Sequence, residues 1–349
     1  MTDVKQIQEQ VQNAGSKFSV LRQEISNTIV GQSYMIDRLL IGLLSNGHIL
    51  LEGVPGLAKT LCVTTLAKAV QANFKRIQFT PDLLPADLIG TMIYNPKEGT
   101  FTTKKGPIFA NLILADEINR APAKVQSALL EAMQEHQVTI GDQSFALDEP
   151  FLVLATQNPI EQDGTYPLPE AQMDRFMFKL LVSFPTAEEL SKIVNLTQVT
   201  MDEQANPVLN AKSLLEMRAV AKEIPVSSEV LDYTVKLVEA SHPERDDAPE
   251  FTKQYVRFGA SPRAAQNMIT AAKVRALMDG RYNVSFDDID ALAYPVMRHR
   301  VKPSFLAITE KIDADTLVYM LLEEINGRGV SSDPKEVAVP KKKRKRLFG

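Results

Sequence analysis

The residues best suited to chemistry form a glycine-containing turn between a strand-like and a helix-like segment. The turn, Gly53-Val54-Pro55-Gly56-Leu57-Ala58-Lys59-Thr60-Leu61, follows the apolar run 48–52 and leads into the helical pattern of 60–70. The N–H groups of such a turn and the positive end of the helix together bind anions. A lysine there adds a point charge for outer phosphates, and a threonine hydroxyl can ligate Mg²⁺. The turn therefore predicts a phosphate-binding loop.

One position of this loop departs from the pattern G-x-x-x-x-G-K-[ST], because Ala58 stands where the second glycine is expected. An alanine can keep a helical backbone, so we expect the loop to persist with less conformational freedom. The alternative is an ordinary Gly/Pro turn followed by Lys59 and Thr60 by chance, since short motifs carry a false-positive risk.

Two acids end the apolar run 111–115. Asp116 at the end of a parallel strand beside the phosphate loop would help to hold the Mg²⁺ shell, commonly through water. Glu117 would orient and deprotonate an attacking water as a general base. The alternative is a strand that ends in solvated acids.

Amides end the next apolar run, 151–156. Asn158 lies where a neutral donor could contact a γ-phosphate or position water without adding a competing charge. Taken alone, Asn158-Pro159 also fits a simple turn, which is a common local signal.

Strand-like and helix-like segments alternate over residues 1–185, which predicts an α/β domain with a parallel sheet. The strands are continuous apolar runs, as expected for a sheet covered on both faces. Strands are expected at 48–52, 74–79, 112–116, 151–156 and 176–182, and helices at 3–13, 17–27, 33–44, 60–70 and 123–135.

The pattern changes near residue 185, so we expect a second, all-helical domain over 186–328. Helix starts are indicated at Thr186, Ser227 and Ser261-Pro262. Residues 329–349 are predicted to form a flexible tail, which carries six consecutive cations at 341–346.

Composition narrows the class of protein. The 349 residues suffice for about two domains, and no apolar run approaches the ~18 residues of a membrane span. Without the six tail cations, 33 basic residues face 43 acidic ones, a net charge of −10, which argues against a general nucleic-acid binder. The single cysteine, Cys62, is expected to be a buried hydrophobe in a reducing cytoplasm, and the four histidines lack metal-ligand spacing.

Taken together, the motifs resemble those of the MoxR family of AAA+ ATPases. They occur in the family's order over residues 29 to about 300, and a small residue at position 58 fits the family pattern. The matching stretches are 53–60, Asp116-Glu117-Ile118-Asn119-Arg120-Ala121-Pro122, 131–135, 155–159, 169–176 and 259–264. The resemblance implies an AAA+ P-loop NTPase domain with a helical lid, binding ATP and Mg²⁺.

The resemblance also implies roles for individual residues. Lys59 and Thr60 would form the Walker A pair, Asp116 and Glu117 the Walker B pair, and Asn158 would be sensor 1.

For two arginines, the resemblance implies roles that their residue type and position alone would not predict. Arg175 resembles the arginine finger supplied to a neighbouring subunit's site, although it could instead pair with Asp174 on the surface. Arg263, at the start of a helix, resembles sensor 2; a cation there opposes the helix dipole unless an anion binds. Gly31 and Gln32 would line the adenine pocket. The sequence does not assign Arg120.

Two β-hairpins are predicted as insertions, one over 90–105 around Asn95-Pro96-Lys97-Glu98-Gly99 and one over 137–147 around Gly141-Asp142. Both could be surface decoration. The first resembles the helix-2 insert of this AAA+ branch, and we hypothesise that Tyr94 and Phe101 contact a protein substrate.

The function expected from the resemblance is ATP hydrolysis in a homo-oligomeric ring, a hexamer, coupled to chaperone-like remodelling or maturation of protein partners, for example by metal insertion or complex assembly. The expected partners are protein clients or an adaptor protein. Two alternatives stay open: a nucleic-acid motor, and an ATP-dependent assembly switch without motor activity. A DNA-stimulated, salt-sensitive ATPase would favour the first alternative.

Overall fold

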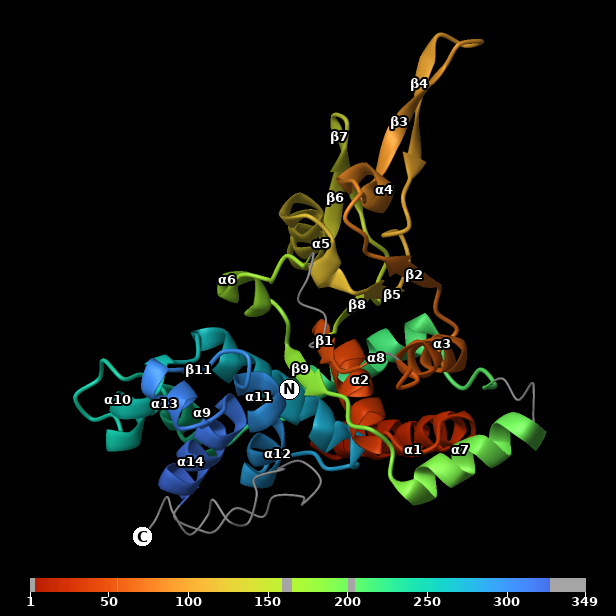
Figure 1. Cartoon of the computed structure of the whole chain (residues 1–349). Coiled ribbons are helices and arrows are strands. Elements are labelled where there is room, and N and C mark those ends of the chain that lie inside the picture. The colour runs from red at the N-terminus through yellow and green to blue at the C-terminus, as the bar shows by residue number, and fades with distance from the viewer. Residues whose placement is uncertain (1–3, 55, 159–164, 200–204, 327–349) are drawn as a thin grey trace. The chain divides into compact units, whose positions relative to one another are not determined.

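The structure is a computed structural model that describes residues 4–54, 56–158, 165–199 and 205–326 (Figure 1). The chain divides into two compact units, residues 1–221 and 222–349, which are described separately. The domain boundary near residue 185 and the tail 329–349 remain predictions, and the tail lies outside the described residues.

A five-stranded sheet forms the centre of the N-terminal unit, in the order β2-β5-β8-β1-β9 with every pair parallel. All five predicted strands are confirmed within one or two residues at their ends. They are β1 (Ile49–Glu52), β2 (Phe74–Gln78), β5 (Leu112–Asp116), β8 (Leu152–Gln157) and β9 (Phe178–Leu181).

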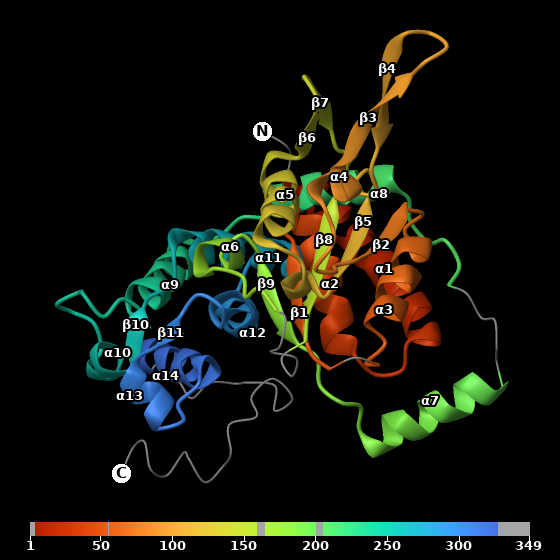
Figure 2. The same ribbon diagram turned by 45° about the horizontal axis from the view of Figure 1, so that its top comes forward.

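Both faces of the central strands β5, β8 and β1 are covered, as their continuous apolar runs predict (Figure 2). The edge strand β2 departs from this expectation, because Lys75, Arg76 and Gln78 are exposed. Alternate residues of a strand face opposite sides, and Ile113 and Val153 belong to a buried cluster that includes side chains of α4 (Pro85–Ile89) and α5 (Ala123–Glu135). On the opposite side, α3 (Lys59–Ala69) contacts β5, and α2 (Ser33–Ser45) contacts β9.

The N-terminal region is one helix, α1 (Val4–Thr28), where two helices were predicted. Gly15 lies in its middle, and an interior glycine costs a helix roughly 1 kcal/mol relative to alanine. An unbroken buried stripe outweighs that cost: it consists of Val11, Ala14, Phe18, Leu21 and Ile25.

The remaining helical segments of this unit connect the strands or follow the sheet. They are the 3-10 turn η1 (Ile118–Arg120), α6 (Glu170–Met173), α7 (Ala187–Val199) and α8 (Ala211–Glu223). The predicted start at Thr186 is confirmed by reciprocal capping bonds, because Thr186 N donates to Glu189 Oε2 and Glu189 N donates to Thr186 Oγ1.

Both predicted hairpins are present. The first pairs β3 (Gly90–Asn95) with β4 (Thr100–Lys105), and the second pairs β6 (Gln137–Ile140) with β7 (Gln143–Ala146). They lie side by side at the top of Figure 1, where the ammonium of Lys105 is 4.6 Å from the ring centre of Phe109 and 5.2 Å from that of Phe145.

The C-terminal unit is helical, as expected, with a small addition. Its helices are α9 (Ser228–Glu239), α10 (Glu250–Tyr255), α11 (Pro262–Met278), α12 (Phe286–Met297), α13 (Phe305–Thr309) and α14 (Ala314–Asn326). The predicted starts at Ser227 and Ser261 are confirmed as N-caps. The addition is a short antiparallel ladder between β10 (Val256–Phe258) and β11 (Lys302–Pro303), too short to show as alternation in the sequence.

Two structural features are absent from the described residues. None of their helices is long and apolar enough to cross a membrane. Within the same ranges, no group of three or more His, Cys, Asp and Glu side chains is arranged to hold a metal ion.

Candidate functional site

The predicted chemical residues meet at one edge of the central sheet. Parallel strands place their carboxyl ends together, and ligands of open α/β sheets bind beside those ends. A pocket of about 430 Å³ lies there. Its lining is Gly53, Gly56, Leu57, Ala58, Lys59, Thr60, Leu61, Arg76, Asp116, Glu117, Thr156 and Asn158.

Among the described residues of the phosphate loop, Gly56 and Ala58 have left-handed backbone. Gly56 has φ 85°, and an added Cβ there would meet nothing within 4 Å, so the loop is open on that side. Ala58 has φ 55° and ψ 19°, so our expectation that it keeps a helical backbone is wrong. The loop must reverse direction immediately before α3, and this geometry costs an L-residue roughly 1–2 kcal/mol that glycine avoids.

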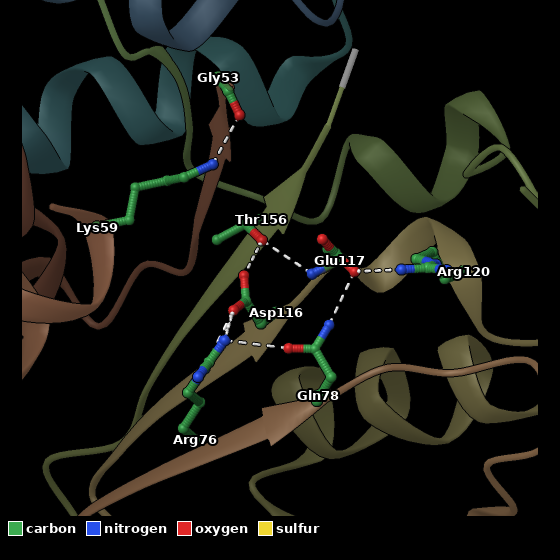
Figure 3. Close-up of polar contacts among 8 residues, drawn as sticks. All are labelled: Gly53, Lys59, Arg76, Gln78, Asp116, Glu117, Arg120 and Thr156. Carbon is green, nitrogen blue, oxygen red and sulfur yellow. Dashed lines mark hydrogen bonds and ion pairs between the residues drawn. The ribbon is translucent and has the colours of Figure 1, made fainter. Parts of the chain in front are cut away.

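Lys59 begins α3, and its ammonium donates a 2.7 Å hydrogen bond to Gly53 O within the same loop (Figure 3). Burial lowers the pKa of Lys59, while the negative charges of Asp116 and Glu117 act in the opposite direction. A phosphate oxygen is a stronger acceptor than a carbonyl, so this ammonium is positioned to exchange one for the other.

Asp116 is bonded through both of its carboxylate oxygens. Oδ1 accepts a 2.6 Å hydrogen bond from Thr156 Oγ1. Oδ2 accepts two bonds from Arg76, from Nε at 3.1 Å and from Nη2 at 2.5 Å. Parallel pairing of β2 with β5 places Gln78 opposite Asp116 and so brings Arg76 to the same edge.

Glu117 has φ 57° and ψ 51°, a left-handed backbone in a residue with a side chain. Such outliers persist where surrounding structure fixes them and often mark functional sites. Its N–H donates to Thr156 Oγ1 at 2.8 Å, and Oε2 accepts from Gln78 Nε2 at 2.8 Å and from Arg120 Nη1 at 3.0 Å. Arg120, which the sequence did not assign, is thus a partner of the candidate base.

The residues present fit a magnesium–nucleotide complex. The carboxylate of Asp116 and the hydroxyl of Thr60 are the hard oxygen donors that Mg²⁺ prefers, and both line the pocket. The open loop at Gly56 and the ammonium of Lys59 suit the phosphates.

A second, mostly apolar pocket of about 210 Å³ suits the base of a nucleotide. It shares Gly56, Leu57, Ala58 and Leu61 with the first pocket. The rest of its described lining comes from residues 28–32, from the segment before α7 and from the first turns of α7, namely Thr28, Ile29, Val30, Gln32, Phe184, Pro185, Glu189, Leu190 and Ile193.

Of the two residues expected at the adenine pocket, Gln32 lines it and donates a 3.2 Å hydrogen bond to Ser183 O. Gly31 is not among the described lining residues. It has φ 70° and lies against Glu189, whose Oε1 would be 2.6 Å from an added Cβ. Val54 is likewise outside the described lining of both pockets, and Pro55 lies outside the described residues.

The two arginines predicted to act on the nucleotide, Arg175 and Arg263, are not among the described residues that line either pocket. Arg175 follows α6 and is partly buried, outside the described lining of both pockets. Arg263 is exposed in the first turn of α11 in the C-terminal unit. Cys62 is buried as predicted, and burial raises the pKa of its thiol to about 12.

Sequence reasoning missed Arg76, Gln78 and Thr156. The signal for the first two was present as polar residues two apart on a strand, but an edge strand with a solvated face gives the same pattern. Thr156 ends an apolar run, and only its contacts to Asp116 and to Glu117 distinguish it from an ordinary strand residue.

Known families match both units. The family described as ATPase family associated with various cellular activities (AAA) matches residues 48–178, and the AAA lid domain matches residues 250–318.

Related proteins match over most of their lengths. Chaperone MoxR1 of Mycobacterium tuberculosis is 46% identical over 313 residues, which cover 90% of this chain and 83% of that protein. Protein MoxR of Paracoccus denitrificans is 30% identical over 88% of this chain and 94% of its own. A crystal structure of a protein from Cytophaga hutchinsonii, described as a candidate ATPase, superposes with a TM-score of 0.86 at 47% identity, covering 93% of this chain and 98% of that one.

Proposed function

Because the chain belongs to the MoxR family of AAA+ ATPases, we propose that it hydrolyses ATP with Mg²⁺ and uses the energy to remodel protein partners. The observation that supports hydrolysis most directly is the shared pocket, where Lys59 and Thr60 of the phosphate loop face Asp116 and Glu117. Remodelling follows the chaperone name of the Mycobacterium tuberculosis relative, which we extend to this chain.

In the proposed mechanism, Lys59 exchanges Gly53 O for the outer phosphates, and Thr60 and Asp116 would hold Mg²⁺. Bound Mg²⁺ would neutralise charge on the β- and γ-phosphates. Glu117 accepts a proton from the water whose oxygen bonds to the γ-phosphorus. The bond from that phosphorus to the β-phosphate oxygen breaks, giving ADP and inorganic phosphate.

Asn158 directly follows β8 and lines the pocket, and its amide is proposed to orient the attacking water. Arg175 lies outside the described pocket of its own chain, which is compatible with a finger that acts on a neighbouring subunit in a homo-oligomeric ring, proposed to contain six copies. Arg263, on the lid, is proposed to contact the γ-phosphate.

The β3–β4 hairpin is proposed to contact the client. Tyr94 and Phe101 pair directly across its strands with ring centres 5.2 Å apart, and they are 52% and 62% exposed. Exposed aromatic pairs on a projecting hairpin are typical of contact surfaces, because their apolar area is costly to leave in water.

Two substitutions test hydrolysis. Glu117→Gln keeps the size of the side chain but removes the base, so it should bind ATP and turn it over about 10²–10⁴-fold more slowly. Lys59→Ala should lose nucleotide binding, measured by equilibrium titration with a fluorescent ATP analogue. Normal turnover by Glu117→Gln would contradict the assignment of the base.

Mixing variants tests the finger in trans. Arg175→Ala and Glu117→Gln should each be nearly inactive, whereas their 1:1 mixture should regain activity at about a quarter of the interfaces, where an intact base meets an intact finger. The control is a mixture of wild type with Glu117→Gln at the same total concentration. An inactive variant mixture that has been shown to co-assemble would contradict action in trans.

The double variant Tyr94→Ala/Phe101→Ala tests whether the β3–β4 hairpin contacts the client. We expect normal basal ATPase and loss of client remodelling, and the matched control is Phe145→Ala on the neighbouring hairpin. Unchanged remodelling by the double variant would contradict the hypothesis.

A further inference from the structure

Arg76 makes the least expected contact in the nucleotide pocket, because it covers the carboxylate proposed to face the metal. Both of its bonds to Asp116 end on one oxygen, Oδ2. The guanidinium also donates to Gln78 Oε1 at 3.1 Å, which keeps it close to β2. A positive group thus lies on the same atom that a cation would approach.

The other oxygen of Asp116 is committed to a fixed contact. Oδ1 accepts from Thr156 Oγ1, and that hydroxyl also accepts the N–H of Glu117. Thr156 is 1% exposed, so turning its hydroxyl away would leave the part-buried N–H of Glu117 without this acceptor. Exchange of partners at Asp116 therefore has to occur at Oδ2.

The bond from Arg76 can be exchanged at little cost. The side chain of Arg76 is 51% exposed and that of Asp116 17% exposed. Exposed ion pairs contribute little stability because water and salt screen them, and a released guanidinium would be hydrated at the pocket mouth.

We propose that Arg76 is the resident counter-ion of Asp116, held on Oδ2 while the metal is absent and displaced when a magnesium–nucleotide complex binds. Arg76 and Mg²⁺ then exclude each other at one oxygen. This inference rests on the proposed ATP site. It assigns to Arg76 a further role, which is to set how strongly nucleotide affinity depends on Mg²⁺.

The charges of the pocket predict in which direction the loss of Arg76 would change nucleotide affinity. Among the described lining residues, Lys59 and Arg76 balance Asp116 and Glu117. Without Arg76, the metal-free pocket would carry an excess negative charge and repel a polyanionic nucleotide. With Mg²⁺ bound, the metal neutralises Asp116, so losing Arg76 should matter less.

The test compares nucleotide affinity with and without metal, and it needs no turnover. A fluorescent ATP analogue is titrated into full-length protein in EDTA and in a Mg²⁺ series. In Arg76→Met, the ratio of the two affinities, with Mg²⁺ over without, should be about fivefold or more above that of wild type. Arg76→Lys keeps the charge but loses the two-bond geometry, so its ratio should rise less.

A matched control is available on α1. Arg22 pairs with Asp37 through one 2.8 Å contact and is 40% exposed, but neither residue is among the described pocket lining. Arg22→Met should leave the ratio unchanged. Combining Arg76→Met with Asp116→Asn should bring the effect of Arg76→Met below about twofold, because the shared oxygen has lost its charge.

Three results would overturn the proposal while leaving the ATP site intact: an unchanged ratio in folded Arg76→Met, a reduced ratio, or Arg76→Lys matching Arg76→Met. Wild-type protein that fails to bind the analogue with Mg²⁺ would instead contradict the proposed function itself. Circular dichroism spectra that match wild type show that each variant is folded.

Discussion

Two carboxylate–arginine clusters, one in each unit, use the same chemistry in different surroundings. In the pocket, Asp116 pairs with Arg76, and the arginine is half exposed. In the C-terminal unit, Asp288 pairs with Arg275 and Arg281, and the carboxylate is 0% exposed. Burial decides what each cluster can do: the first can exchange its partner for a ligand, and the second is committed to holding the fold.

The buried cluster shows how such a carboxylate is kept charged. Burial alone would raise the pKa of Asp288, but hydrogen bonds from Arg281 and Ser285 and the charges of both arginines outweigh it, so the pKa lies below its ordinary value. Ser285 N and Oγ donate to Oδ2 at 2.8 and 3.0 Å, which joins the cluster to the N-cap of α12.

Removing the buried charge should have the largest effect on stability. Asp288→Asn leaves two arginines without their shared anion and should lower the free energy of unfolding by about 3 kcal/mol. Urea denaturation measures the loss, and hydrogen exchange along α12 should locate it in the C-terminal unit.

The matched control is Asp279→Asn, which breaks a 3.0 Å pair with the same Arg281 at a 41% exposed carboxylate and should cost less than about 1 kcal/mol. Asp116→Asn should likewise cost about 1 kcal/mol or less. Equal losses at Asp288 and Asp116 would break the comparison between the clusters.

The pH dependence of stability should distinguish a buried group of the N-terminal unit from the buried cluster of the C-terminal unit. His48 is buried, with Nδ1 accepting the N–H of Val153 and Nε2 donating to Met133 O, both at 3.0 Å. Burial lowers its pKa from 6.5 to about 4, helped by the charge of nearby His136, while the bond to Met133 acts in the opposite direction. The unfolded chain therefore takes up the proton first as pH falls.

The stability due to neutral His48 is complete above pH 6.5 and is lost between pH 6.5 and 4, by up to roughly 3 kcal/mol. Asp288 behaves otherwise, because a lowered carboxyl pKa contributes stability above the unfolded value of 3.8 that is lost only at lower pH. His48→Gln should flatten the loss between pH 6.5 and 5, because glutamine takes up no proton in this range. An equally steep loss in His48→Gln would contradict this assignment.

Thr156→Val tests the fixed part of the pocket cluster. Valine has the shape of threonine but leaves the N–H of Glu117 and one oxygen of Asp116 without their partner, so unfolding should become easier by about 1–3 kcal/mol. Thr64→Val removes a hydroxyl that bonds only to carbonyls of its own helix and should change stability by less than about 0.5 kcal/mol. If Thr156→Val lowered the free energy of unfolding no more than Thr64→Val does, the bond between Thr156 and Asp116 would not be a fixed contact, and our distinction between the two oxygens of Asp116 would be wrong.

The smallest effect is expected at Ala58. Glycine relieves the left-handed backbone but adds freedom to the unfolded chain, so Ala58→Gly should raise the unfolding free energy by roughly 0.5 kcal/mol. Ala128→Gly, inside α5, should lower it by about 1 kcal/mol. Thermal unfolding measures both, and destabilisation by Ala58→Gly would mean that the loop carries no strain at this position.

Much of the fold was predictable because its signals are local. Strands β1, β5 and β8 are short apolar runs that end in polar residues, and the hairpin 90–105 is marked by its turn residues. The break expected within α1 was wrong, because the glycine signal is local whereas the packing of the apolar stripe is tertiary.

Local sequence was enough to predict the phosphate loop, the paired acids Asp116 and Glu117 and the alternation of strands and helices, because each signal lies in neighbouring residues. Tertiary structure decided the left-handed backbone of Ala58 and the contact between Arg76 and Asp116. Those two side chains are 40 residues apart, and they meet only because β2 and β5 pair in parallel in one register. Strand order and register depend on how the whole sheet is packed, and no short stretch of sequence contains that information.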